Sequence, residues 1–248
     1  MRSACVLFWG VATVPFLFAW ILIAFLFAPS GKGATMAASW WARSLLAVGG
    51  VRVRVEGAEH LFADTPVLYI SSHASNLDPW VLFPHLPGHV RMVSKQSLRW
   101  IPFFGWGVAA ARFILIDRNN RERAIASLQR AAERIHKGIS VLVFAEGTRS
   151  RDGRLQEFKK GGFHLAVAAK VPLIPLALLG VARSLPRGSV WVRPGQAVLR
   201  VGAPIVVTDQ TPDELRQQAY QAVRALLDDG VDPTHPAQQA GPRAPEQS

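Results

Sequence analysis

The hydrophobic positions of this chain follow two different patterns. From Ala4 to Ala28 the sequence contains no charged residue and is dense in Phe, Leu, Ile, Val and Trp. As a helix this stretch would be about 37 Å long at ~1.5 Å per residue, against a bilayer hydrocarbon core of about 30 Å. It is therefore long enough to cross a membrane. Pro15 in its middle predicts a kink or a division into two shorter helices.

A second, amphipathic stretch runs from Met36 to Val48, after a Pro- and Gly-containing break. Its adjacent Trp40 and Trp41 and its lone Arg43 favour a helix at the level of the lipid headgroups. We therefore predict that residues 1–50 form a membrane-anchoring helical segment. The alternative is a secretory signal peptide, but the apolar run is longer than usual and no clear cleavage site follows it.

The remaining hydrophobic pattern alternates between strand and helix periods. Val51 to Glu56 reads VRVRVE, the period-two pattern of a half-exposed strand. Strands alternating with helices predict an α/β domain over residues 51–229. From Gly230 onward Pro, Gln, Gly and Ala predominate, so residues 230–248 are predicted to be a disordered tail. Further strands are expected at Pro66–Ser71, Ile139–Phe144, Leu173–Leu179 and Ala197–Val201, and helices at Asn119–Lys137, Gly162–Lys170 and Thr211–Leu227.

Composition and charge limit the kinds of molecule that this protein can bind. Half of the 248 residues are hydrophobic, and the formal net charge is +11. The single Cys5 excludes an intrachain disulfide and a cysteine metal site, and it fits a reducing compartment. The positive charge calls for nucleic acid, anionic lipid or a phosphorylated substrate, and the apolar N-terminus favours lipid. A nucleic-acid binder would need its cations in a groove-sized stripe and would bind in a steeply salt-dependent way.

One candidate catalytic pair lies where a predicted strand ends. Within Ser72–Pro79, Asp78 followed by Pro79 predicts a helix N-cap, and His73 lies in the preceding turn. A neutral imidazole there can take a proton from a hydroxyl while the carboxylate fixes its tautomer. The alternative is a capping aspartate beside an idle surface histidine. Taken alone, the segment favours that simpler interpretation.

A second segment, Phe144–Ser150, favours the catalytic interpretation of His73 and Asp78, because it also follows a strand. Ligands of α/β sheets bind outside the carboxyl ends of strands, so this segment should open beside His73. Gly147 permits a tight turn, and the Arg149 guanidinium suits a phosphate. Arg151 and Arg154 read as a solvated basic loop.

A third segment, Lys95–Gly107, interleaves Trp and Phe with Lys95 and Arg99. The rings can be plain core. Their mixing with cations also suits a surface that lies among lipid headgroups.

These segments resemble the motifs of the glycerolipid acyltransferase family, in particular its 1-acylglycerol-3-phosphate acyltransferases. The family's first motif is a His, four residues and an Asp, and its third is Phe-Pro-Glu-Gly-Thr-Arg-Ser. The resemblance covers about residues 51–204 and keeps the order and spacing of four motifs. The matching residues are His73 and Asp78, Lys95 through Pro102 and Gly105 to Ile116-Asp117-Arg118, Phe144–Ser150 with Phe158-Lys159-Lys160-Gly161, and Val171–Pro175.

The resemblance implies a glycerol-3-phosphate-acyltransferase-like mixed sheet flanked by helices, and a direct acyl transfer. In it His73 is the base and Asp78 orients it, while Arg149 binds the acceptor phosphate with help from Lys95. Glu146, Gly147 and Thr148 shape that pocket, and we expect Glu146 to hold Arg149 in place.

Two positions depart from the family pattern. Ala145 stands where Pro is usual, which should loosen the turn before Glu146. Arg112 stands where many members have Gly, which should add a cation near the acceptor.

The implied substrates are a membrane lysolipid, foremost lysophosphatidic acid, and acyl-CoA or acyl-carrier protein as the acyl donor. The implied product is phosphatidic acid, made in phospholipid biosynthesis. No metal or prosthetic group is expected, and the implied location is the bacterial inner membrane with the site facing the cytoplasm. The alternatives are glycerol-3-phosphate or another lysolipid as acceptor, or a non-catalytic membrane-binding protein, which would not be expected to keep both His73 and Asp78.

Overall fold

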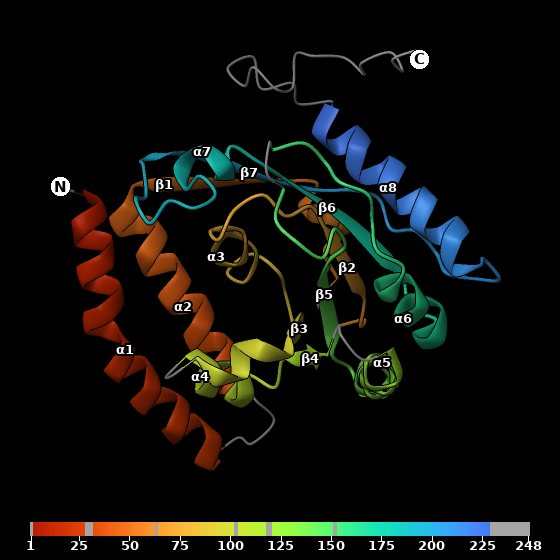
Figure 1. The fold of residues 1–248 in the computed structure, drawn as a ribbon, viewed down its shortest axis with the longest axis horizontal. Coiled ribbons are helices and arrows are strands. Elements are labelled where there is room, and N and C mark those ends of the chain that lie inside the picture. Colours follow the sequence, from red (N-terminus) through yellow and green to blue (C-terminus); the bar gives the residue numbers. More distant parts are fainter. Residues whose placement is uncertain are drawn as a thin grey trace.

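The computed structural model describes residues 2–27, 32–62, 64–101, 104–117, 121–150 and 153–228. Its centre is one seven-stranded sheet of order β1-β7-β6-β2-β5-β3-β4 (Figure 1). The strands are β1 (Val51–Glu56), β2 (Leu68–Ser71), β3 (Val90–Lys95), β4 (Ile114–Ile116), β5 (Ser140–Phe144), β6 (Leu173–Leu179) and β7 (Gly195–Val201).

Strand direction decides where the loops of interest meet. Strands β2 to β6 pair in parallel, whereas β7 runs antiparallel to β6, and β1 is parallel to β7. The carboxyl ends of β2, β3, β5 and β6 therefore lie at one edge, hereafter the carboxyl edge. The mixed sheet confirms the predicted fold class.

Helices cover both faces of the sheet. One face is covered by α1 (Arg2–Phe27), α2 (Lys32–Gly49) and α3 (Asp78–Leu82), and the other by α5 (Arg121–His136), α6 (Gly161–Ala169) and α8 (Pro212–Asp228). Each face has its own apolar core, with Tyr69 on the first and Ile70 on the second as successive residues of β2. Short helices η1 (Ala58–His60), η2 (Gln96–Trp100), α4 (Phe104–Ala110) and α7 (Val181–Ser184) complete the fold.

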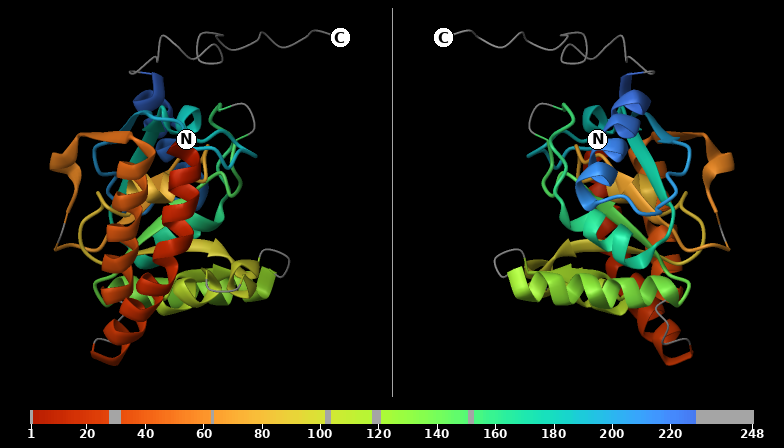
Figure 2. Two further views of the ribbon diagram at one scale, coloured as in Figure 1. Left: turned by 90° about the vertical axis from the view of Figure 1, so that its left-hand side faces the viewer. Right: turned by 90° about the vertical axis from the view of Figure 1, so that its right-hand side faces the viewer.

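The N-terminal helices form a pair along one flank of the domain. In Figure 2, α1 and α2 run side by side. Pro15 lies inside a single helix, so the expected division into two pieces does not occur. Much of α1 faces outward with large apolar side chains: Leu7, Phe8, Trp9, Val11, Phe16, Trp20 and Ile23. Among the described residues, Ser3–Ile21 is the one stretch long and apolar enough to cross a membrane.

Several local predictions are confirmed in detail. The bounds of β1 and β6 are those expected from their patterns. The Thr211 N–H donates to the Glu214 carboxylate at 2.8 Å, and the Glu214 N–H donates to Thr211 Oγ1 at 3.3 Å, which is the expected capping box at the start of α8. Gly138 has φ 85° just past α5, as a C-cap glycine requires.

Other parts of the fold were missed or lie outside the described residues. Strands β3 and β4 and helix α4 were not predicted, because β4 and α4 are short and β3, VRMVSK, has no regular alternation of apolar and polar residues. The predicted tail, 230–248, lies outside the described residues, as does Arg118.

Candidate functional site

The first candidate pair meets at the carboxyl edge. His73 follows β2, and its Nδ1 lies 2.7 Å from Oδ2 of Asp78. Asp78 is fully buried, while the His73 side chain is 18 % exposed. With Nδ1–H donating to the carboxylate, Nε2 carries the free lone pair and can accept a proton.

Asp78 differs in position from the expected N-cap. It is the first residue of α3, with Leu77 at the cap and no side-chain capping bond. Its Oδ2 instead accepts the backbone N–H groups of Ala74 at 2.8 Å and Ser75 at 2.9 Å, besides the His73 ring. The carboxylate is thus turned back into the preceding loop, where it organises the whole turn around His73.

The plane of the His73 ring is fixed by Phe144. The two rings stack with centroids 4.0 Å apart at 19°. Phe144 ends β5, the strand beside β2, so sheet pairing places this ring under the imidazole. The hydrogen bond to Asp78 and this stacking together hold one orientation of Nε2.

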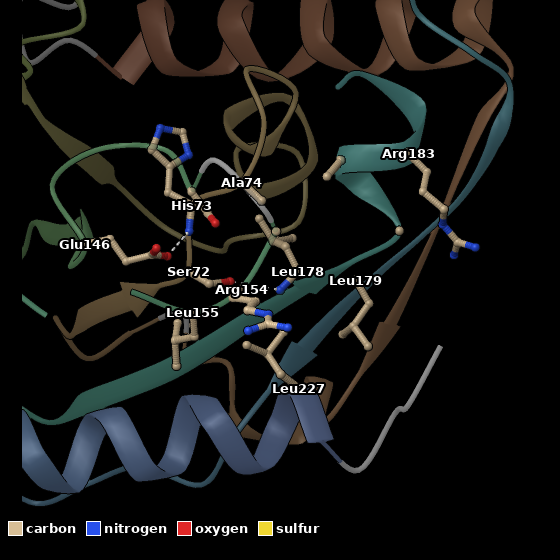
Figure 3. A pocket seen from close by; sticks show the side chains of 14 residues that line it. Ser72, His73, Ala74, Glu146, Arg154, Leu155, Leu178, Leu179, Arg183 and Leu227 are labelled. Atoms are coloured by element: carbon tan, nitrogen blue, oxygen red, sulfur yellow. Dashed lines mark hydrogen bonds between the residues drawn. The ribbon is translucent and has the colours of Figure 1, made fainter. Parts of the chain in front are cut away.

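Glu146 is 2 % exposed and anchors the loop that carries His73. Its Oε1 accepts the His73 backbone N–H at 2.7 Å, drawn dashed in Figure 3, and its Oε2 accepts the Gln156 N–H at 3.1 Å. We expected it to hold Arg149. Within the described residues no ion pair joins Glu146 to Arg149, because both carboxylate oxygens face backbone N–H groups.

The turn that carries Glu146 depends on its neighbours. Gly147 has φ 73°, the left-handed conformation that favours glycine. Ala145, which stands where the family usually has proline, makes a backbone bond of its own. Its N–H donates to the Ser71 carbonyl at 3.2 Å, a bond that proline could not make, and so extends the pairing of β2 with β5 up to the catalytic loop.

The predicted phosphate ligands lie at the same edge. Arg149 is half-buried and Thr148 exposed, and the Ser150 N–H donates to the His73 carbonyl at 2.8 Å, which keeps this segment beside the histidine. Lys95 ends β3, is exposed, and is separated from β2 by β5. The structure thus brings His73, Asp78 and Glu146 into contact and places Lys95 two strands away.

Arg112 lies elsewhere. It precedes β4, and its carbonyl accepts a bond from Arg134 at 3.1 Å, while its charge acts on Arg91 near the start of β3. That is the edge of the sheet opposite His73. The expectation that Arg112 adds a cation near the acceptor is therefore wrong. Arg112 precedes β4, so it lies at the amino ends of β3 and β4 rather than at the carboxyl edge.

A small cavity of about 40 Å³ lies beneath the backbone of residues 72–74. Its walls include Arg154, Leu155, Leu178 and Leu227. In Figure 3 the His73 ring points away from these side chains. The space suits a few waters at most, so this cavity is too small to hold an acyl chain.

Two further contacts had no sequence signal. Ser75 Oγ donates to the Leu185 carbonyl at 2.7 Å, and Arg187 Nη1 donates to the Arg149 carbonyl at 2.7 Å. Both tie the site to the segment that follows α7. Ser75 lies inside the first motif, but its partner 110 residues away could not be read from spacing.

Comparisons with known proteins agree with this geometry. A family model described as Acyltransferase matches residues 52–179, just over half of the chain. A 1-acyl-sn-glycerol-3-phosphate acyltransferase of Cocos nucifera is 33% identical over 75% of this chain and 60% of its own length. The Saccharomyces cerevisiae protein of that name is 34% identical over 72% of this chain and 60% of its own, and the human alpha form 32% over 72% and 63%. The chain thus spans about 60% of the length of these three curated relatives.

A solved structure shares the fold. The 1-acyl-sn-glycerophosphate (LPA) acyltransferase PlsC of Thermotoga maritima superposes with a TM-score of 0.78 at 22% identity, covering 93% of this chain and 98% of that one. Its likeness extends over the N-terminal helices as well as the sheet, since nearly the whole chain is covered. On the family match and these relatives together, the chain belongs to the acyltransferase family.

Proposed function

We propose that this protein transfers a fatty acyl chain to the sn-2 hydroxyl of lysophosphatidic acid, making phosphatidic acid for phospholipid biosynthesis. The observation that carries the proposal is the 2.7 Å contact of His73 Nδ1 with a fully buried Asp78, which leaves Nε2 as a base at the carboxyl edge. Relatives named for this activity support the choice of acceptor.

The mechanism follows from that contact. His73 Nε2 takes the proton of the acceptor hydroxyl as its oxygen attacks the thioester carbonyl carbon of the donor. Asp78 holds the tautomer and stabilises the imidazolium that forms. When the tetrahedral intermediate collapses, the C–S bond breaks and the thiol leaves with the proton that His73 returns. No metal or prosthetic group takes part.

We assign the acceptor phosphate to Arg149. Its planar fork can bind two phosphate oxygens. Its carbonyl is held by Arg187, and the next residue is bonded to His73, so the backbone of Arg149 is fixed beside the base. Lys95, exposed at the end of β3, assists as a second cation, while Gly147 and Thr148 form the turn between Glu146 and Arg149.

We place the enzyme at a membrane, in the bacterial inner membrane with its site toward the cytoplasm. The outward apolar face of α1 supports membrane binding. The single cysteine fits a reducing compartment. The donor is acyl-CoA or acyl-carrier protein, whose shared thioester is the group that the proposed chemistry uses.

An acceptor panel tests the proposal. The purified chain in detergent micelles is offered acyl-CoA with lysophosphatidate, glycerol-3-phosphate or lysophosphatidylcholine. We expect the highest kcat/KM with lysophosphatidate. A clear preference for either of the other acceptors would contradict the assignment.

The phosphate role has its own test. We expect Arg149→Ala to raise KM for lysophosphatidate far more than KM for the donor. Arg52→Ala, an exposed arginine on β1, is the matched control and should change neither. Equal effects of Arg149→Ala on both substrates would remove the phosphate role.

A further inference from the structure

The loop between α7 and β7 exposes two large apolar side chains at its tip. Val190 is 60 % exposed and Trp191 is 56 % exposed. Neither is used by the proposed chemistry. Two exposed apolar side chains do not by themselves mark an interaction surface, so how the tip is held and what surrounds it decide whether this one does.

The tip is held in place rather than free. The Trp191 N–H donates to Ser189 Oγ at 3.0 Å, and the Ser189 N–H donates to the Pro186 carbonyl at 3.0 Å. On the other side Val192 is 4 % exposed, and the Arg193 N–H donates to the Ser184 carbonyl at 2.7 Å. These bonds present Val190 and Trp191 outward in a defined conformation.

The same loop is fastened to the N-terminal helices. Ser3 Oγ, on the first turn of α1, donates to the Val192 carbonyl at 2.7 Å. A Cβ placed on Gly49 at the end of α2 would meet Val192 at 2.9 Å and Val6 at 3.5 Å, so the loop packs where the two helices meet. Figure 1 shows the loop beyond α7 reaching the N-terminal end of α1. The loop that carries the tip therefore packs against the first turns of α1, the helix whose outward side carries exposed apolar residues.

The charges around the tip indicate which kind of apolar partner it binds. Arg187 and Arg193, both exposed, flank the tip in sequence. Tryptophan prefers the membrane–water interface, and flanking arginines suit anionic phospholipid headgroups. A protein partner would be expected to meet a broader apolar patch than one two-residue tip.

We propose that the Val190–Trp191 tip is a second membrane anchor, which enters an anionic lipid surface beside α1. The inference deepens the proposed function, because the loop is bonded to the catalytic segment through Ser75 and to Arg149 through Arg187. Seating the tip in the interface therefore fixes the candidate site at the level of the headgroups, where a lysolipid phosphate lies.

Site-directed labelling tests this directly. Cys5, the single cysteine, is changed to Ser, and Val190→Cys is labelled with an environment-sensitive nitrobenzoxadiazole dye. Val206→Cys is the matched control, since Val206 is 64 % exposed but follows β7 near the start of β6. The full chain is reconstituted into vesicles of phosphatidylcholine and phosphatidylglycerol, and quenching by aqueous iodide and by spin-labelled lipid is measured.

We expect the dye at position 190 to become several-fold less sensitive to iodide and to be quenched by the spin-labelled lipid, with little change at position 206. Equal iodide quenching at the two positions would overturn the proposal. Protection at position 190 in lipid-free detergent that rises with protein concentration would also overturn it, in favour of a second copy of the chain. No acyl transfer is measured, so failure of this anchor and failure of the proposed activity remain distinguishable.

Discussion

The two edges of the sheet both bury charge, but with opposite arrangements. At the carboxyl edge the buried groups are the carboxylates Asp78 and Glu146, and their described partners are a histidine ring and backbone N–H groups. At the opposite edge the buried group is Arg91, 1 % exposed, and the groups that shift its pKa are other arginines.

The surroundings of Arg91 disfavour its charge. Burial, followed by the charges of Arg112 and Arg134, lowers its pKa to about 10. Its Nη1 donates to Thr35 Oγ1 at 3.2 Å and to the Val90 carbonyl at 3.2 Å, which fastens α2 to β3. The two buried charges differ in their neighbours: Asp78 adjoins a histidine whose Nε2 has a free lone pair, whereas the hydrogen bonds described for Arg91 go to a hydroxyl and a carbonyl.

The largest expected effect is at the carboxyl edge. His73→Ala removes the base and should lower kcat for acyl transfer by about 10²–10⁴-fold, as general-base catalysis contributes that much. The unfolding temperature should fall as well, because the buried Asp78 carboxylate loses a partner and Phe144 loses its stacked ring, so kcat is measured well below that temperature. His60→Ala, in η1, is the control and should keep full activity. Activity of His73→Ala within a few-fold of the parent would assign the base elsewhere.

The second prediction distinguishes the structural role of Glu146 from the proposed catalytic role of His73 at the same edge. Glu146→Gln places an NH₂ group against one of two backbone N–H donors, those of His73 and Gln156. An unsatisfied buried donor costs about 1–3 kcal/mol, so the unfolding free energy should fall by that amount and kcat should fall more than KM rises. Glu157→Gln, which alters an exposed carboxylate paired with Arg216, is the control. Unchanged stability would show that the contacts of Glu146 are dispensable.

Local patterns predicted much of the fold, and the site only in outline. The alternation of β1, the apolar run of β6 and the capping box at Thr211 are all properties of adjacent residues. The pairing of His73 with Asp78 spans five residues, so a single turn determines it.

What the sequence could not predict depends on long-range geometry. The partners described for Glu146 are backbone groups, which carry no side-chain signature. The place of Arg112 depends on the direction of β4, a strand of three residues that has no readable period. Asp78 looked like an N-cap because Pro79 follows it, yet its carboxylate turns toward three donors on the other side.

The third prediction concerns the opposite edge and should affect stability rather than activity. Arg91→Met keeps similar volume and removes a buried charge, together with the desolvation cost of burying it. Because the lowered pKa shows that the site disfavours the cation, we expect a higher unfolding temperature and kcat within about twofold of the parent. Arg52→Met, on the exposed side of β1, controls for loss of charge alone. A lower unfolding temperature would mean that the bonds to Thr35 and Val90 outweigh the cost of burial.

The smallest expected effect is a pH dependence at the opposite edge. Burial, then the charges of Lys32 and Arg91, lower the pKa of His89 below its usual value of about 6.5. The unfolded chain therefore binds a proton at His89 more readily than the folded chain does. The stability that this gives the folded chain is fully present above the usual pKa of histidine. It is lost as the pH falls from that value through the lowered pKa of the folded chain.

His89→Gln removes this titration. Between about pH 8 and about pH 5, the span over which histidine charges, the unfolding free energy of the parent should fall more steeply than that of the variant. Introducing Arg91→Met into the parent should make its unfolding free energy depend less steeply on pH, because one of the two cations that oppose protonation of His89 is gone. Parallel curves for parent and His89→Gln would mean that His89 does not feel the cations of this edge, and the contrast between the two edges would then rest on Arg91 alone.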